Sequence, residues 1–424
     1  MSLEPSSVSA LRAEFPALQQ TESGRPIIFF DGPGGTQVHG TVIEAMGRYL
    51  TEANSNAHGA FLYSRRTVDT TDAARQALAD FLNAPRPDEI VFGANMTTLT
   101  FNLSRAIGRT LAPGDEIVVS RLDHDADIAP WLALQERGAV IRFVDLNPGD
   151  CTLDMAEMEA AINSSTRLVA AGYASNAVGT INDVRRIGEM AHAAGAWIYV
   201  DAVHYAPHGP IDVQAIDCDF LVCSTYKFFG PHLGALYGRY EVLDALPAYK
   251  VRPAPDDPPG KFETGTGNFE AQAGATAAVD YLASVGRRFG GEFAQRYPNF
   301  QGRRRDLKAG LAAIRAYERG LCERLVAGLG EIQGLRIYGI TDPARFDERV
   351  PTVSFTLEGL TPNHVARRLD EANIFVWDGN FYALAVTERL GLEEHGGLVR
   401  VGLAHYSTAE EMDTLVGVLA DMPR

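Results

Sequence analysis

The sequence has few cysteines, no long apolar run and no excess of positive charge. Four cysteines in 424 residues are too few for a disulfide framework, which predicts a reducing compartment, the cytoplasm. No apolar run approaches the ~18 residues that a membrane helix needs. The first residues, MSLEPSSVSALRAEF, also lack the apolar stretch of a secretory signal. The 38 basic and 54 acidic residues give a net charge of −16, which argues against nucleic acid or an anionic membrane as the main partner.

Lysine is also scarce. Only four of the 38 basic residues are lysines, namely Lys227, Lys250, Lys261 and Lys308. Arginine stays charged and is rarely a nucleophile, so any amine chemistry must come from these four residues. The rest of the composition, 46% hydrophobic and 22% charged, is typical of a globular protein with a large core.

Six apolar runs of strand length alternate with helical patterns between residue 28 and about residue 290. They are residues 89–94, 115–120, 139–146, 167–175, 196–202 and 219–224. The runs are continuous rather than alternating, which is typical of buried parallel strands with helices on both faces of the sheet. The repetition of strand and helix predicts an α/β fold with a mainly parallel sheet.

The pattern changes near residue 290. Leucines and isoleucines recur at helical spacing between Asp306 and Ile332, which predicts one long amphipathic helix. Short strands (335–340 and 351–357), a helix after Thr361 and a C-terminal helix from about Ser407 follow. We therefore predict an N-terminal segment (1–27) that packs on a small α+β domain (291–424), and a large domain (28–290).

Three of the predicted strands lead into reactive side chains. In open α/β sheets ligands bind beyond the carboxyl ends of the strands, and His124, Asp201 and Lys227 follow such ends. Lys227 comes after a buried apolar strand and before the segment FFGPHLGALYG, so we predict a partly desolvated amine. A lowered pKa would let that amine attack a carbonyl group. The other three lysines are predicted in loops or on exposed helix faces.

Each neighbouring candidate has a functional and a structural interpretation. Asp201 is either a cap for the next helix or a carboxylate that holds a proton on a pyridine nitrogen. His124 is either a loop histidine or a ring that stacks on a planar cofactor. Thr97 and Thr98 open a helix, where they either bind a phosphate or act as N-caps.

Two other motifs do not meet the requirements of the binding sites that they resemble. The glycine-rich segment 31–37 is not the G-x-G-x-x-G of a dinucleotide site. His204 and His208 have the spacing of a zinc-binding helix, but Pro207 and Pro210 prevent a regular helix there. No metal site is predicted.

Taken together, these residues resemble one family. Thr97-Thr98, His124, Asn176, Asp201, His204 and Ser224-Thr225-Tyr226-Lys227 are similar to the class V aminotransferase group of fold-type I pyridoxal-phosphate enzymes, in its cysteine desulfurase and selenocysteine lyase branch. The resemblance runs from about residue 28 to the end. It is most specific over residues 200–238, 262–268 and 398–413.

The resemblance implies roles for the residues around the cofactor ring. Lys227 would bind pyridoxal 5'-phosphate as a Schiff base and move protons, and Asp201 would bind the pyridinium nitrogen. His124 would stack on the ring and Asn176 would contact the ring hydroxyl. His204 stands where the desulfurases usually have glutamine, and both side chains can form hydrogen bonds to the cofactor.

The resemblance also implies a phosphate site and a substrate site. Thr97, Thr98 and Ser224 would hold the phosphate, and Thr266 would reach it from the second subunit of a homodimer. Arg400 would pair with the substrate carboxylate, for which a bidentate guanidinium is the natural partner. Tyr226 stands where the desulfurases usually have histidine.

One segment departs from the branch. In desulfurases the loop ahead of the carboxylate-binding arginine carries the cysteine that accepts sulfur, but residues 374–386 (IFVWDGNFYALAV) contain none. Tyr382 takes that place, and Trp377 stands where the branch usually has arginine. We predict that Tyr382 and Asn380 contact the substrate. The alternative is a loop that only packs on the second domain.

These observations predict a homodimeric, cytoplasmic, pyridoxal-phosphate-dependent enzyme that acts on a small amino acid. Elimination of a β-substituent, as in a C–S lyase, fits best because a persulfide cysteine is missing. An aminotransferase or an epimerase is the alternative within the family. A nicotinamide-dependent oxidoreductase and a non-catalytic binding protein are the alternatives from other classes.

Overall fold

A seven-stranded sheet forms the centre of the larger lobe. The computed structural model describes residues 3–423. The strand order is β4-β12-β11-β10-β9-β5-β6, with β4 at Ile90–Gly93, β5 at Glu116–Ser120, β6 at Val140–Val144, β9 at Thr166–Gly172, β10 at Trp197–Asp201, β11 at Phe220–Ser224 and β12 at Gly234–Gly238. Neighbours from β11 to β6 pair in parallel. Only β12 runs antiparallel to its two neighbours, so the sheet is mainly parallel, as predicted.

Two strands of this sheet differ from the sequence prediction. Strand β12 was not predicted, because glycines at both of its ends leave only a short apolar run. The run 139–146 was predicted to be buried, but its strand β6 lies at the edge of the sheet, and Val140 on it is 38% exposed. An edge strand has one neighbour only, which a single apolar run does not reveal.

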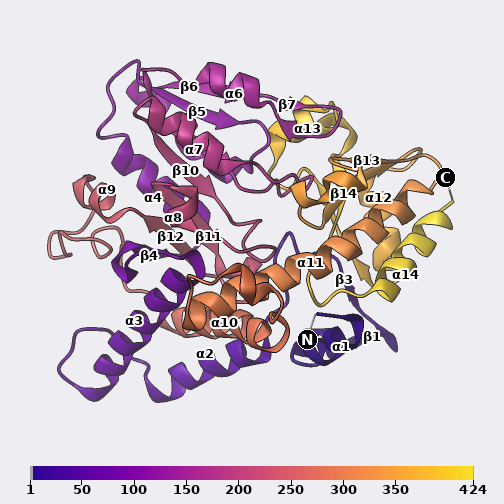
Figure 1. Ribbon diagram of the computed structural model, residues 1–424, viewed down its shortest axis with the longest axis horizontal. Helices are drawn as coiled ribbons and strands as arrows, with labels where there is room; N and C mark the ends of the chain where they lie inside the picture. Colours follow the sequence, from indigo (N-terminus) through magenta and orange to yellow (C-terminus); the bar gives the residue numbers. More distant parts are fainter. Residues whose placement is uncertain (1–2, 424) are drawn as a thin grey trace.

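Helices cover the sheet and form a separate layer beside it (Figure 1). The crossover segments contain α4 (Met96–Ile107), α5 (Ala129–Leu132), α6 (Met155–Ala161), α7 (Val184–Ala193) and α8 (Val213–Ile216), and α9 (Tyr240–Ala245) follows β12. Helix α7 packs on β9 and β10, and α4 packs on β11 and β12. Helix α10 (Phe269–Phe289) packs against α2 (Gly40–Glu52) and α3 (Leu62–Leu82).

Helix α11 (Gly302–Gly330) links the two lobes. It begins four residues before the predicted start, packs along α10 and continues to the smaller lobe (Figure 1). The two helices touch closely at Gly286, where a Cβ atom would lie 1.8 Å from the Asp306 carbonyl oxygen. A larger residue there would force the helices apart.

The smaller lobe is built on an antiparallel sheet of order β13-β14-β17-β16. The strands are β13 (Leu335–Tyr338), β14 (Thr352–Leu357), β16 (Trp377–Gly379) and β17 (Leu398–Gly402). Helices α12 (Pro362–Asp370) and α14 (Ala409–Ala420) pack with α11 around it, and α13 (Leu384–Arg389) precedes β17. The predicted α+β organisation is confirmed, including the helix after Thr361, which caps α12.

The N-terminal segment contacts the smaller lobe. It contains α1 (Pro5–Arg12), β1 (Thr21–Glu22) and β2 (Arg25–Pro26), and it leads into β3 (Ile28–Phe29), which pairs with β15 (Ile374–Phe375). Arg12 forms an ion pair of 2.7 Å with Glu411 on α14.

A hairpin of β7 (Leu146–Asn147) and β8 (Thr152–Leu153) completes the strands. The domain limits at residues 27 and 290 stay a prediction. No helix within residues 3–423 is both long and apolar enough to cross a membrane.

Candidate active site

A pocket lies where the carboxyl ends of β9, β10 and β11 meet the start of α4. Gly172 and Asp201, the last residues of β9 and β10, line it. Six of the residues proposed from the sequence also line it: Thr97, His124, Asn176, Asp201, His204 and Lys227. The strand-end rule therefore located the pocket correctly.

Lys227 has the properties of a reactive amine. Its Nζ donates a hydrogen bond to the Pro33 carbonyl oxygen and lies 5.1 Å from the centre of the Tyr226 ring. Burial lowers the pKa of Lys227 to about 7; the charge of Arg400 acts in the same direction and that of Asp201 opposes it. A large fraction of the amine is therefore neutral near neutral pH, as a nucleophile requires.

The prediction of a loop or an exposed helix face is wrong for Lys308, which lies buried on α11, while Lys261 lies in a loop as predicted but is buried there. Lys261 is 6% exposed and Lys308 is 3% exposed. Lys308 donates to the Ile211 carbonyl oxygen (2.7 Å) and pairs with Asp212 (3.0 Å), while Lys261 donates to a backbone carbonyl. Burial lowers the pKa of both amines. Burial alone therefore does not single out Lys227; its position in the pocket does.

Asp201 is a buried carboxylate beside the pocket. Its Oδ1 accepts a hydrogen bond from the Val203 N–H (2.8 Å). Burial raises its pKa to about 6, while that hydrogen bond and the charge of Lys227 favour the ionised form. The alternative that Asp201 caps the next helix is wrong, because α8 begins at Val213 and is capped by Asp212.

His124 lies neutral in the pocket wall. Its Nδ1 accepts the Ala126 N–H (2.9 Å), which fixes the orientation of the ring. Burial lowers the pKa of His124 to about 4, and the charges of Lys227 and Arg400 act in the same direction. The Tyr382 ring stacks on it, with centroids 5.5 Å apart and an interplanar angle of 16°. His124 thus presents an aromatic face of the kind that a planar ring stacks on.

The first turn of α4 adjoins Ser224. Asn95 caps this helix and accepts hydrogen bonds from the N–H and the hydroxyl of Thr98. The alternative that Thr97 or Thr98 is the N-cap is therefore wrong. The Met96 N–H donates to the Ser224 Oγ (3.1 Å), which brings the end of β11 to the helix N-terminus. Such a terminus favours an anion.

Arg400 comes from the smaller lobe, on β17. It is 3% exposed, and it donates to the Asn176 carbonyl oxygen (2.9 Å). The Phe381 ring covers the guanidinium, whose Cζ lies 4.1 Å from the ring centre. Burial lowers the pKa of Arg400 to about 9, and the charge of Asp31 opposes this shift.

Two buried polar groups near Arg400 have no hydrogen-bond partner among the described residues. They are the Arg400 Nε and the Asn176 Oδ1. An unsatisfied buried group costs about 1–3 kcal/mol, so a polar ligand is expected to contact both. The Asn176 Nδ2 donates to the Phe381 carbonyl oxygen (2.9 Å), which leaves its oxygen as the free group.

His204 lines the pocket and joins it to β14. It shares a hydrogen bond of 2.9 Å with the Thr352 hydroxyl. Burial lowers the pKa of His204 well below its usual value, so the ring is neutral.

Six residues proposed from the sequence lie outside the pocket lining: Thr98 and Ser224 near the start of α4, Arg400 on β17, and Thr266, Asn380 and Tyr382. Thr266 is exposed in the turn before α10. Asn380 uses its amide within its own lobe, donating to Glu393 (3.0 Å) and accepting the Tyr382 N–H (3.1 Å). Tyr382 is 73% exposed, apart from its stacking on His124.

Asp123 and Tyr226 line the pocket without having been proposed as site residues. Asp123 gives the same signal as Asp201, since it is a carboxylate shortly after a buried strand. The role of Phe381 has no such signal, because it depends on the contact between Phe381 and Arg400.

A buried lysine and aspartate at the strand ends of a mainly parallel sheet, beside a helix N-terminus, define a fold-type I pyridoxal-phosphate enzyme. The sequence profile of the family described as "Aminotransferase class-V" matches residues 28–290 and 307–415 of this chain. The chain belongs to the class V aminotransferase family, and its cofactor is pyridoxal 5'-phosphate.

Named relatives agree with this assignment. The chain is 34% identical to a probable cysteine desulfurase of Mycolicibacterium paratuberculosis, over 96% of this chain and 57% of the relative. It is 32% identical to a probable cysteine desulfurase of Synechocystis, over 96% of this chain and 94% of the relative. The chain spans only 57%, 63% and 64% of the length of three of the curated relatives. The solved cysteine desulfurase of Thermococcus onnurineus NA1 superposes with a TM-score of 0.84 at 29% identity, covering 97% of each chain.

The pocket fits the family's cofactor. It offers an amine at Lys227, a buried carboxylate at Asp201, a neutral aromatic face at His124 and an unpartnered oxygen on Asn176. Family membership also removes the support for a nicotinamide-dependent or non-catalytic protein.

The pKa of Lys227 sets the pH dependence of cofactor uptake. Only the neutral amine attacks an aldehyde, so the rate should rise as the pH increases through about 7 and then level off. Mixing cofactor-free protein with pyridoxal phosphate and following the visible absorbance measures this rate. A rate that keeps rising to the usual pKa of lysine, about 10.4, would contradict the lowered pKa.

Proposed function

We propose that this enzyme eliminates a β-substituent from a small amino acid, in the manner of a C–S lyase, without storing sulfur on a cysteine. The observation that carries the proposal is the absence of cysteine from residues 374–386, whose aromatic side chains lie over His124 and Arg400. The relatives named as cysteine desulfurases support an amino acid as the substrate.

The bound cofactor supplies an aldehyde that reacts with amines and a ring that withdraws electrons from the substrate Cα. Lys227 would hold the cofactor through its Nζ and would remove the Cα proton of the substrate. Asp201 would keep a proton on the ring nitrogen through its carboxylate. His124 would exclude water from one face of the ring, and Asn176 would accept a hydrogen bond from the ring hydroxyl.

Other groups bind the two anionic ends. Thr97, Thr98 and Ser224 would hold the phosphate together with the N-terminus of α4. Arg400, whose Nε has no partner among the described residues, would pair with the substrate carboxylate, and the Phe381 ring would limit access of water to that pair. His204, which shares a hydrogen bond with Thr352, would also hydrogen-bond to the cofactor.

No cysteine offers an accessible thiolate. All four are buried and none lines the pocket. Burial raises the pKa of Cys151 to about 11 and also raises the pKa of Cys322. Burial raises the pKa of Cys218 and of Cys223 further than that of Cys151. A thiol that accepts sulfur from a substrate must be ionised and accessible. Sulfur is therefore expected to leave as sulfide.

Incubation with cysteine should give no sulfur adduct on any of the four cysteines, and at most slow release of sulfide with pyruvate and ammonia. Mass spectrometry of the protein and product analysis measure this together. Alanine produced in rapid turnover, with an adduct on a cysteine, would contradict the proposal and indicate a desulfurase. A keto acid that retains the β-substituent would indicate an aminotransferase, and inversion at Cα an epimerase.

Tyr382→Phe provides a matched variant for the same assay. The ring that stacks on His124 is kept and only the hydroxyl is lost. We expect a changed substrate preference or turnover with the cofactor still bound.

We further propose a homodimer in which Thr266 reaches the partner's phosphate site. Thr266 is exposed and lies outside the pocket of its own chain. Large apolar side chains are also exposed on α2 and at the start of α3: Ile43 (53%), Leu50 (51%), Phe61 (58%) and Leu62 (50%). Exposed large apolar side chains of this kind support a subunit interface on this part of the chain.

A mixed dimer tests the shared site. Thr266→Ala should weaken cofactor binding about tenfold, for the loss of one hydrogen bond to a charged group worth about 1.5 kcal/mol. A heterodimer of Lys227→Ala and Thr266→Ala chains should regain one site of parental affinity, because its intact lysine faces the partner's intact threonine. A heterodimer whose remaining site stays weak, or a monomer that holds the cofactor tightly, would contradict the proposal.

A further inference from the structure

Three carboxyl groups are buried close together at the pocket, and two of them, those of Asp123 and Asp201, belong to its lining. Asp123 is 2% exposed, Asp127 0% and Asp201 8%. Asp123 Oδ1 accepts the Gly172 N–H (2.9 Å), and Asp127 Oδ1 accepts the Trp131 indole N–H (3.3 Å). The second oxygen of both Asp123 and Asp127 has no partner among residues 3–423. No lysine or arginine in that range forms an ion pair with either.

The sheet brings Asp123 next to Asp201. In the register of β9 and β10, Gly172 stands opposite Asp201, and neighbouring strands lie about 4.8 Å apart. Asp123 binds the N–H of that same Gly172. The glycine makes room for the carboxyl, since a Cβ atom there would lie 2.7 Å from the Asp123 Oδ1.

Asp127 is connected to the same strand, β10, through its hydrogen-bond partner Trp131. Its partner Trp131 packs edge-on against Tyr199, with ring centroids 5.2 Å apart. Tyr199 lies two residues before Asp201, so both side chains point to one face of the strand. Tyr199 itself is paired with the hydroxyl of Thr100 (2.7 Å) and does not bind the carboxyl.

Three negative charges cannot be held in such a setting. Burial raises the pKa of Asp123 to about 8, with the charge of Asp201 adding to the shift. Burial raises the pKa of Asp127 well above its usual value, and the charges of Asp123 and Asp201 add to it. Nor does a metal ion compensate them, because no group of acidic, histidine or cysteine side chains within residues 3–423 is arranged to hold one.

Asp201 is the best placed of the three to be ionised. It alone faces the charge of Lys227, and burial raises its pKa only to about 6. The other titratable groups around the cluster are His124 in the pocket wall, Tyr199 on β10, Cys223 on β11 and Tyr226 after β11, all uncharged near neutral pH.

We propose that Asp123 and Asp127 are positioning residues that remain protonated, so that the one negative charge of the cluster is held on Asp201. The inference rests on the proposed function in one respect, the role of Asp201 at the ring nitrogen. In this arrangement the two neutral acids place no further negative charge beside Asp201. They do not compete with Asp201 for the proton on the ring nitrogen of the cofactor.

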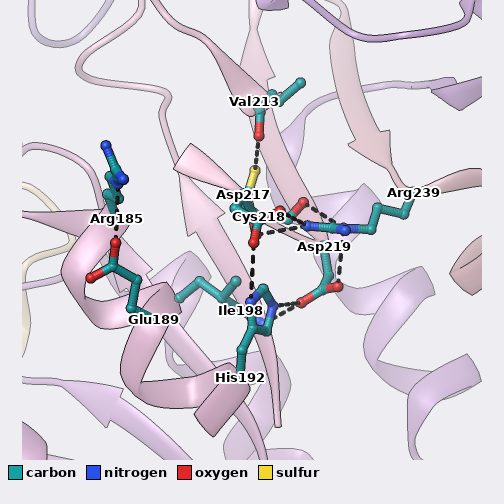
Figure 2. Close-up of polar contacts among 9 residues, drawn as sticks. All are labelled: Arg185, Glu189, His192, Ile198, Val213, Asp217, Cys218, Asp219 and Arg239. Carbon is teal, nitrogen blue, oxygen red and sulfur yellow. Dashed lines mark hydrogen bonds and ion pairs between the residues drawn. The ribbon is translucent and has the colours of Figure 1, made fainter. Parts of the chain in front are cut away.

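Asp219 supplies the control. It is as buried, at 5% exposed, but it is surrounded by donors: the Ile198 N–H (2.9 Å), the His192 Nε2 (2.9 Å) and the Arg239 Nε (3.3 Å) (Figure 2). Asp219 therefore has the cationic partner that Asp123 and Asp127 lack.

Infrared spectra of the full chain near neutral pH distinguish the two kinds of carboxyl. Asp123→Asn and Asp127→Asn should each remove a protonated-carboxyl C=O band that is present in the parent. Asp219→Asn should remove carboxylate absorption and leave those bands in place. Spectra in which neither cluster variant loses a protonated-carboxyl band would overturn the proposal.

The pH dependence of unfolding gives an independent measure. A folded-state pKa above the unfolded value means that the fold binds more protons, so the parent loses stability as the pH rises from about 4 towards the raised pKa. An amide cannot ionise, so both cluster variants should match or exceed the unfolding temperature of the parent near pH 8, and this advantage should shrink on acidification. Asp219→Asn should lower the unfolding temperature near neutral pH. Cluster variants that lose stability as Asp219→Asn does, or that fail to fold, would contradict the proposal.

Neither the infrared spectra nor the unfolding temperatures require turnover. A failure of the inference about the carboxyl cluster can therefore be distinguished from a failure of the proposed function. Protonated bands together with an active Asp201→Asn variant would leave the cluster standing and refute the role of Asp201. An inactive Asp201→Asn variant, together with parent spectra that show no protonated-carboxyl band, would support the role of Asp201 and refute the protonated cluster.

Discussion

Lys227→Ala should lower turnover by at least about 1,000-fold, equivalent to ~4 kcal/mol of barrier. The amine is both the attachment point for the cofactor and the base for the Cα proton in the proposed function. Its lowered pKa of about 7 and its place in the pocket suit it to both roles. Steady-state kinetics measure the loss, and the visible absorbance of the purified variant should change as well.

Lys308→Ala is the matched control, because Lys308 is also a lysine shielded from solvent but pairs with Asp212 outside the pocket. Its loss leaves a carboxylate without its cation and should cost about 1–3 kcal/mol of stability. Turnover per folded molecule should stay within a few-fold of the parent. The proposed function would be wrong if the two variants lost activity to the same extent.

Asp201→Asn should bind the cofactor but turn over roughly 1,000-fold more slowly, again ~4 kcal/mol of barrier. The amide keeps the shape of the side chain and an oxygen for the Val203 N–H, but it removes the charge that holds the ring proton. Absorbance spectra test cofactor binding and kinetics test turnover.

Asp219→Asn serves as the control for this substitution as well. It removes a buried carboxylate that lies away from the pocket, beside His192 and Arg239 (Figure 2). Stability should fall while turnover per folded molecule changes little. Activity of Asp201→Asn within a few-fold of the parent would show that the charge is not needed.

The sequence was sufficient to predict most of the central sheet and one side of the pocket. Its strands are continuous apolar runs, and parallel strands place their carboxyl ends at one edge, so Asp201 and Lys227 were brought together by a general rule. The same rule had already given His124, and applied to Asp123 it would have added a fourth residue.

Features that depend on contacts between distant segments could not be predicted. The covering of Arg400 by Phe381 joins β17 to the segment after β16, and the pairing of Lys308 joins α11 to the start of α8. The edge position of β6 depends on which strands lie beside it, and β12 is marked mainly by glycines. Local periodicity carries no information about such neighbours.

Reduction of the purified protein with borohydride, followed by peptide mapping, tests the central claim most directly. Borohydride fixes the cofactor to the amine that holds it, and the structure offers four lysines, of which three lie outside the pocket. We expect the label on the peptide that contains Lys227. A label on Lys250, Lys261 or Lys308, or a protein with no bound aldehyde, would contradict the account.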